Sequence, residues 1–309
     1  MSTFRVEILK KLRRSAEPIL LRGLASGLKR LGYEARPIAV DLRNTTDDPI
    51  EALYRSGGRP FLINLPLDKA RGLNHLAFPC TSGSKHPFIA TARAHLAGTL
   101  KNDRRSPLEQ FYQHWTPNSA AEVLGLLDDG SAALSQSPPH GAVLPWTALG
   151  PQDMAKSLAA AVFKENRSFN RHFGIEEGCP ASGRMSDRKI ELEYVRLIDV
   201  TESIRKKGFI CELHGFVRGY LLIRDNDYVC VINKGQHRIA ALAALGYVNI
   251  PVKIRTSSYV PTFAVHRADV ESWPNVKKGL FSVEQALKIF DRIFEGRQST
   301  NIGHLLEYV

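Results

Sequence analysis

The sequence predicts an α+β protein in which a mixed sheet with helices occupies the C-terminal half of the chain. Residues 229–254 show the pattern strand, tight turn, helix, strand. Residues 86–116 show two helical segments, the second with a serine cap at its start, and residues 33–66 alternate strand-like and helical segments. We therefore expect a mixed α/β region and a helical region to precede the sheet.

The first thirty residues interleave basic and apolar side chains at helical spacing, with an interruption at Pro18. A basic amphipathic helix can lie on a membrane surface. A charged helical face is more often simply solvated, and we favour that interpretation over peripheral membrane contact.

The next segments indicate a small α/β unit. Strands are expected in 33–42 and 59–66, because both are short apolar runs bounded by turn residues. A helix is expected in 47–56, with Asp47 or Asp48 as its cap and Pro49 in its first turn. Residues 71–84 are rich in Gly, Ser and Pro, which predicts a loop.

The middle of the chain is predicted to be helical. One helix runs from His86 to about Leu100, and a second begins at Ser106-Pro107 with a serine cap and an early proline. The second carries Phe111, Tyr112 and Trp115, a set that is more typical of a core than of a ligand face. Residues 130–141 read as a linker. Residues 150–184 are polar and weakly patterned, so they form either a lid over a site or a surface excursion.

The most informative stretch is 229–254. Val229–Ile232 predicts a buried strand, Lys234-Gly235 a tight turn, Arg238–Leu245 a helix ended by Gly246, and Ile250–Ile254 a second strand. The helix start presents free backbone N–H groups and the positive end of the helix dipole. With His237 and Arg238 in its first turn, this start predicts an anion site suited to phosphate. The alternative is that His237 caps the helix and Arg238 forms a structural salt bridge.

The segment Gly235-Gln236-His237-Arg238, followed by Ala-Ala-Leu-x-x-Leu-Gly and Ile-Pro-Val, resembles the phosphate-binding box of the ParB/sulfiredoxin superfamily. Residues 196–208 resemble its leading helix and 219–233 the hairpin before the box, so the resemblance covers about 190–256. It implies a ParB/sulfiredoxin-like mixed sheet and a bound nucleotide (ATP, ADP or CTP), with Mg²⁺ as an optional partner. Lys234 joins the box as a candidate phosphate ligand, and His214 and Arg218 are candidate site-lining residues.

Free-serine kinases of the superfamily carry a catalytic glutamate close to the place of Glu191 and Glu193, which stand before the leading helix. Either could act as general base or hold Mg²⁺. With a helix starting near Glu193, we prefer Glu191 as the base and expect Glu193 to cap the helix. The alternative is that both are solvated acids favoured by the helix dipole.

The departures from the superfamily restrict the function. Gln236 stands where sulfiredoxin has its nucleophilic cysteine, which argues against peroxiredoxin repair. Lys234 stands where the serine kinases have an acid, and lysine binds phosphate but not Mg²⁺. No helix-turn-helix pattern follows residue 256, whereas ParB partition proteins have one there. Instead, Ser282-Val-Glu-Gln285 forms a capping box before an apolar helical face.

Composition places the chain among soluble globular proteins. Its 309 residues are 43% hydrophobic and 24% charged, with no run of membrane-spanning length and no signal-like start. The four cysteines lack CxxC pairing, which favours reduced thiols over a disulfide frame or a zinc site. We therefore expect a cytoplasmic protein, and the family resemblance implies a bacterial one. The net charge of +11 suggests nucleic acid, anionic membrane or phosphorylated small molecules as partners.

Four parts are predicted: an N-terminal α/β region (1–84), a helical region with a linker and a candidate lid (85–185), a ParB/sulfiredoxin-like domain (186–260) and a C-terminal helical extension (261–309). The leading hypothesis is a nucleotide-dependent phosphotransferase or nucleotide hydrolase that acts on a small hydroxylated molecule. The alternatives are a ParB-like DNA-binding protein gated by nucleotide, or a non-catalytic accessory protein of bacterial surface-polysaccharide assembly. Weak, non-specific nucleic-acid binding is expected. The sequence leaves open the nucleotide, the acceptor and the oligomeric state.

Overall fold

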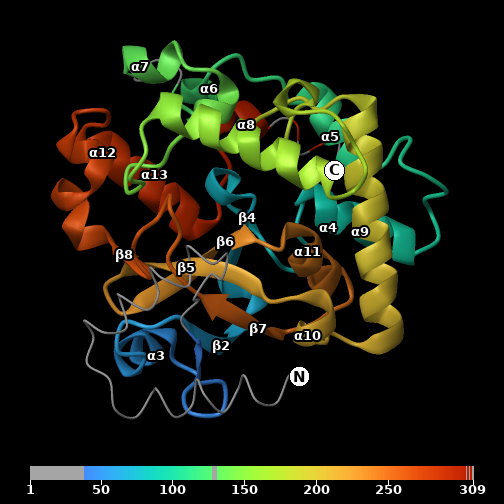
Figure 1. The fold of residues 1–309 in the computed structure, drawn as a ribbon, viewed down its shortest axis with the longest axis horizontal. Helices are drawn as coiled ribbons and strands as arrows, with labels where there is room; N and C mark the ends of the chain where they lie inside the picture. The colour runs from blue at the N-terminus through green and yellow to red at the C-terminus, as the bar shows by residue number, and fades with distance from the viewer. Residues whose placement is uncertain (1–37, 127–130, 304, 306, 308–309) are drawn as a thin grey trace, which may run out of the picture. The chain divides into compact units, whose positions relative to one another are not determined.

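One mixed sheet collects strands from both halves of the chain (Figure 1). The computed structural model describes residues 38–126, 131–303, 305 and 307, so the basic helix expected in the first thirty residues lies outside the described part. Within that part the sheet has eight strands in the order β1-β2-β7-β5-β6-β3-β4, with β8 paired to β5. The strands are β1 Val40–Asp41, β2 Phe61–Pro66, β3 Ala70–Gly72, β4 Phe78–Pro79, β5 Val217–Arg224, β6 Asp227–Lys234, β7 Asn249–Ile254 and β8 Ala264–His266.

β5 is the central strand because it pairs with three others. It is antiparallel to β6 through a tight hairpin, parallel to β7 and parallel to β8. The pairing with β6 shifts register between Arg218 and Gly219, which marks a bulge at the end of the hairpin. β2 runs antiparallel to β7 over its whole length. The N-terminal strands and the strand–turn–helix–strand unit of 229–254 therefore share one sheet.

Helices cover both faces of this sheet. The larger ones are α4 (Pro87–Leu96), α8 (Pro151–Arg167), α9 (Asp187–Lys207), α11 (Gln236–Ala244) and α13 (Val283–Glu295). The shorter ones are α3 Pro49–Arg55, α5 Pro107–His114, α6 Ala120–Leu124, α7 Ala132–Ser135, α10 Cys211–His214, α12 Pro274–Lys277 and α14 Thr300–Gly303. The general α+β class is confirmed.

Side chains on the two faces of the sheet belong to two different hydrophobic cores. Leu221, Cys230 and Val252 pack in a core with residues of α4, α9 and α11. Tyr220 and Leu222 point to the opposite face, where the core contains residues of α6 and α13 and two tryptophans, Trp146 and Trp273. Because neighbouring residues of a strand face opposite sides, β5 needs apolar residues at nearly every position, as a strand buried on both faces does.

Local sequence signals placed several helix starts correctly. Asp48 caps α3 by accepting the N–H of Ile50, Ser106 caps α5, and Ser282 and Gln285 form the capping box of α13. The side chains of Phe111, Tyr112 and Trp115 are at most 2% exposed, so this aromatic set belongs to the core as predicted.

Two local predictions were wrong, and one helix was not predicted. α9 begins at Asp187 with Ser186 as its cap, and not near Glu193. Residues 151–167 form the 17-residue helix α8, which the sequence hid because the helix buries only Ala155, Val162 and Asn166. Residues 71–84 are not simply a loop: they contain β3 and β4, held by pairing of β3 with the distant β6.

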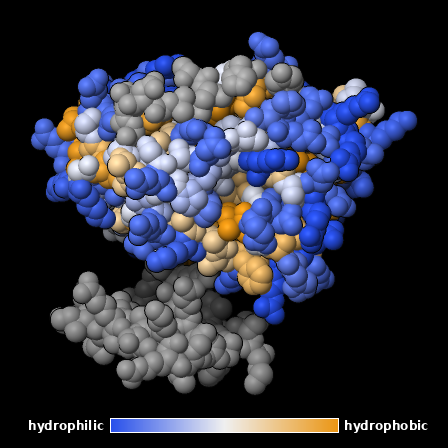
Figure 2. Space-filling model, turned by 90° about the horizontal axis from the view of Figure 1, so that it is seen from above, coloured by the Kyte–Doolittle hydropathy of each residue, from blue (hydrophilic) through white to orange (hydrophobic). Residues whose placement is uncertain are grey.

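The surface seen in Figure 2 is mostly hydrophilic with small hydrophobic areas. Within the described ranges, no helix combines the length and the apolar character needed to cross a membrane. All four cysteines are buried, and none of them forms a disulfide with another described residue.

Among the described residues, His75 and His86 are buried in the core, and neither has an acidic partner there. His86 is fully buried, and its Nδ1 accepts the N–H of Phe88 at 3.2 Å, which caps α4. Gly72 lies against its other nitrogen, since a Cβ at Gly72 would come within 2.7 Å of Nε2. Burial lowers the pKa of His86 to about 3 and that of His75 to about 4.

These histidines predict loss of stability in mild acid. Their folded pKa values lie below the ordinary 6.5, so their contribution is full above pH 6.5 and falls as the pH drops towards 4. His86→Asn keeps a cap for α4 and removes one titrating group. We expect it to flatten the dependence of unfolding free energy on pH, measured by urea titration between pH 7 and pH 4. The same substitution at the exposed His172 is the control, and equal slopes in all three proteins would contradict the prediction.

Candidate phosphate-binding site

The turn between β6 and α11 is built around one arginine. Gly235 has φ 97° and ψ 34°, a left-handed conformation that glycine adopts without strain. A Cβ there would lie 3.2 Å from the guanidinium of Arg238, and one at Gly215 would lie 2.8 Å from its Nη1. Arg238 also donates from Nη1 to the carbonyl of Phe216 at 2.9 Å. Two glycines and one carbonyl thus fix the guanidinium beside the start of α11.

The N-terminus of α11 is open. The carbonyl of Gly235 accepts the N–H of Ile239, as the first bond of the helix requires. The N–H groups of Gln236, His237 and Arg238 meet no acceptor among the described residues. These groups carry the positive end of the helix dipole, which favours an anion.

Four cations converge on this helix start: Arg218, Lys234, Arg238 and Arg255, called here the basic cluster. Arg218 and Lys234 occupy directly opposed positions of the β5–β6 ladder, where like charges repel. Burial, then the charges of Arg218 and Arg238, lower the pKa of Lys234, with a smaller effect of Arg255. Burial and the charge of Arg218 also lower the pKa of Arg238. The fold therefore holds these cations together against their mutual repulsion.

His237 is held from two sides. Its ring packs edge-on against Phe88, with centroids 5.2 Å apart and planes at 89°. Its Nε2 lies 2.7 Å from Oε2 of Glu193, although the N–H is not aligned for a regular hydrogen bond, so the contact is mainly electrostatic. The side chain keeps 16% exposure. α9 and α4 thus fix the orientation of the imidazole in the first turn of α11.

Glu193 is the centre of a buried charge network. Its carboxylate is 2% exposed and contacts Lys189 at 2.6 Å and Arg196 at 3.0 Å, besides His237. Burial tends to raise the pKa of Glu193, but the charges of His237, Arg196 and Lys189 outweigh this and hold the pKa well below its ordinary range. Lys189 also donates to Oδ1 of the buried Asn166 at 2.8 Å.

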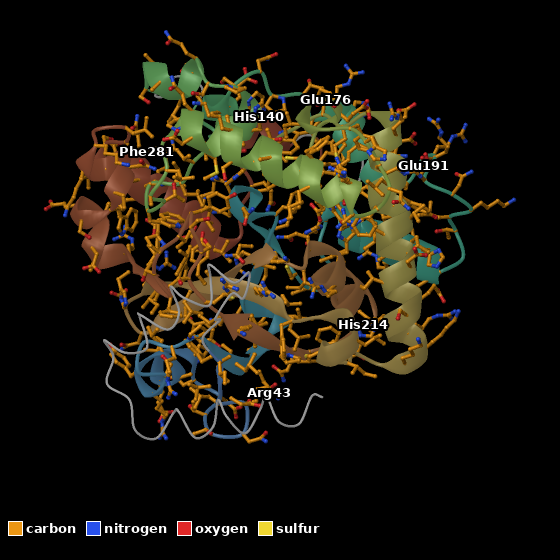
Figure 3. The ribbon with its side chains drawn as sticks, in the orientation of Figure 1. Arg43, His140, Glu176, Glu191, His214 and Phe281 are labelled. Carbon is orange, nitrogen blue, oxygen red and sulfur yellow. The ribbon has the colours of Figure 1, made fainter. Side chains whose placement is uncertain are left out.

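The two predicted acids fall in different places. Glu193 faces α11, whereas Glu191 is an exposed residue of α9 (Figure 3), about 200° around the helix from Glu193. The expectation that Glu193 caps the helix start was wrong, because both acids lie inside α9. Their catalytic roles stay predictions.

Gln236 has a structural role through its side chain. Its amide nitrogen donates to the carbonyl of Ile232 at 2.6 Å, and its Oε1 accepts the N–H of Leu73 at 3.0 Å. Both ends of the amide are therefore occupied, and only the backbone N–H of Gln236 is directed to the open helix start.

His214 is part of α10 and not of the hairpin. Its Nε2 lies 3.0 Å from Oγ of Ser203 on α9, and its ring stacks on Phe209. Figure 3 shows it beside α10 and the neighbouring end of α9. These contacts tie α10 to α9.

Sequence reasoning missed two residues of the site. Arg255 follows β7 directly, where the basic residue after an apolar run was the available signal. Glu165, on α8, is the acid that acts on Lys234 and contacts Arg196 at 2.6 Å. No local signal marks Glu165, because it lies far away in the sequence.

Comparison with known proteins adds no relative. No protein-family model matches the chain, and neither a curated protein nor a solved structure matches it significantly. The ParB/sulfiredoxin resemblance therefore stays an expectation from the residues of the box.

The Glu193 network predicts a large stability difference between neighbouring acids. Glu193→Gln leaves Lys189 buried without its carboxylate, a change that costs about 3–5 kcal/mol of unfolding free energy. Glu191→Gln, at an exposed position of the same helix, is expected to change stability by less than about 0.5 kcal/mol. Urea denaturation at neutral pH measures both, and similar losses in the two variants would contradict the network's importance.

Proposed function

We propose that this protein binds the phosphate groups of a nucleotide at the basic cluster and the open N-terminus of α11. The observation that carries the proposal is the convergence of Arg218, Lys234, Arg238 and Arg255 on one helix start. Burial and the charges of Arg218 and Arg238 lower the pKa of Lys234, and a polyanion at this helix start would offset that electrostatic effect. The resemblance of 235–238 to a phosphate-binding box supports the same ligand.

The cluster combines the donors that phosphate binding needs. Guanidinium groups bind phosphate oxygens through paired N–H donors, and backbone N–H groups at a helix start add fixed donors. Each charge-assisted hydrogen bond contributes about 1.5–3 kcal/mol. Because two glycines and Phe88 already fix Arg238 and His237, little conformational entropy remains to be lost on binding.

The geometry supports binding better than phosphotransfer. A general base must have a free lone pair and reach the substrate. Glu193 is buried and in contact with Lys189, Arg196 and His237, and Glu191 faces away from the box. Within the described part of the chain no three acidic, histidine or cysteine side chains group as a metal site would require. The cluster offers arginine, lysine and backbone N–H groups, whereas Mg²⁺ requires oxygen ligands. A bound Mg²⁺ would therefore be held by the nucleotide phosphates.

DNA binding is the second candidate and is favoured by the net charge of +11. Non-specific binding of this kind weakens steeply with salt through counterion release. The basic cluster is one focus of charge and not a row along a groove, so we rank it below nucleotide binding.

The proposal predicts that Lys234 strengthens nucleotide binding and lowers the stability of the fold. Lys234→Gln should lower ATP affinity about tenfold, as loss of one charge-assisted contact does. Burial and the charges of Arg218 and Arg238 lower its folded pKa, so the protonated lysine destabilises the fold. We therefore expect the variant to melt at an equal or higher temperature than the wild type.

Calorimetric titration with ATP and thermal unfolding test this prediction. Lys206→Gln is the matched control: it removes the same charge from a side chain that is 68% exposed on α9. Unchanged ATP affinity in Lys234→Gln, or an equal loss in Lys206→Gln, would refute the proposed site. A lower melting temperature in Lys234→Gln would show that the lysine is structural.

A further inference from the structure

Phe169 is an exposed aromatic side chain that is rigidly held beside the charge network. It lies in the tight turn after α8, where its N–H donates to the carbonyl of Asn166 at 3.0 Å. Two further backbone bonds close this turn, from Asn170 to Arg167 and from Arg171 to Asn166. Asn166 is itself buried and bound to Lys189 and to the carbonyl of Phe173. The ring is nevertheless 45% exposed.

One arginine links this ring to the proposed phosphate site. The guanidinium carbon of Arg196 lies 4.4 Å from the ring centroid of Phe169, a cation–π distance. The same guanidinium contacts Glu193 at 3.0 Å, and Glu193 contacts His237 at 2.7 Å. On its other side it contacts Glu165 at 2.6 Å, and Glu165 acts electrostatically on Lys234. Arg196 thus joins Phe169 to His237 through Glu193, and to Lys234 of the basic cluster through Glu165.

We infer that the ring of Phe169 stacks with the base of a nucleotide whose phosphates occupy the basic cluster. The inference rests on the proposed function, and it assigns a binding position to the base of the proposed nucleotide. A rigid aromatic face offers stacking energy at low entropic cost, and every nucleobase presents a π-face. Glu165 is 51% exposed and carries acceptor oxygens for the amino or hydroxyl hydrogens of a nucleoside.

This arrangement selects a nucleoside phosphate from among phosphorylated compounds. Inorganic polyphosphate and sugar phosphates have no aromatic ring to place on Phe169. A nucleic acid strand would need cations spaced along its backbone and successive aromatic platforms, whereas here one aromatic face accompanies one focus of charge. The ligand class is therefore a free nucleotide.

The test compares ATP with inorganic tripolyphosphate as calorimetric probes of the full chain. Phe169→Ala should lower ATP affinity about tenfold, as loss of one base–aromatic stack does, and leave tripolyphosphate affinity unchanged. Phe169→Trp should restore ATP affinity. Phe163→Ala is the matched control, because Phe163 lies on α8 with the same 45% exposure; it should change neither affinity.

The outcomes separate the two proposals. If the wild type binds tripolyphosphate and ATP equally, or if Phe169→Ala weakens both ligands alike or neither, the base site is refuted and the phosphate site stands. If the wild type binds neither probe, both proposals fall. If a single-stranded oligonucleotide binds more tightly than ATP and depends on Phe169, the free-nucleotide assignment is overturned in favour of nucleic acid.

Discussion

The buried carboxylate of Glu193 is the interaction on which the rest of the site depends. A cationic Lys189 with 2% exposure is tolerated only because this carboxylate lies 2.6 Å away. The same carboxylate reaches α11 through His237 and α8 through Arg196 and Glu165. One acid therefore fixes how three helices meet. Its contacts with Lys189, Arg196 and His237 also make it a weak candidate for a proton acceptor.

The sheet supplies the second constraint, because it brings the cations together. Arg218 is the second residue of β5, Lys234 ends β6 and Arg255 follows β7, so the ends of three adjacent strands meet beside α11. The bulge after Arg218 and the left-handed Gly235 turn the chain there into the helix. The cations repel one another, and the packed cores on both faces of the sheet keep them in place.

The aromatic part of the site comes from a different region of the chain. Residues 150–184 have a polar, weakly patterned sequence, yet they form α8 and the turn that carries Phe169. Their position is set by Asn166, whose side chain joins the turn to Lys189 of α9. The region considered for a lid thus provides an ordered edge of the site, with Glu165 and Phe169 as its exposed groups.

The sequence alone determined the features that depend on nearby residues. The caps of α3, α5 and α13, the buried strands β6 and β7, and the glycine turn before α11 follow from local propensity and spacing. The general α+β class and the candidate box at 234–238 follow in the same way. The finer ParB/sulfiredoxin-like fold stays a prediction.

Tertiary structure decided the rest, because each remaining feature joins residues far apart in the chain. Pairing of β3 with β6 turned an apparent loop into strands. Because α9 begins at Asp187, both Glu191 and Glu193 lie inside the helix. Two residues along a helix differ by about 200°, so Glu191 lies on the exposed side and Glu193 on the buried side. Glu165 and Phe169 entered the site through Arg196, a contact between helices that no local pattern encodes. Local signals set which residues can bind an anion, whereas burial and long-range contacts set which of them meet.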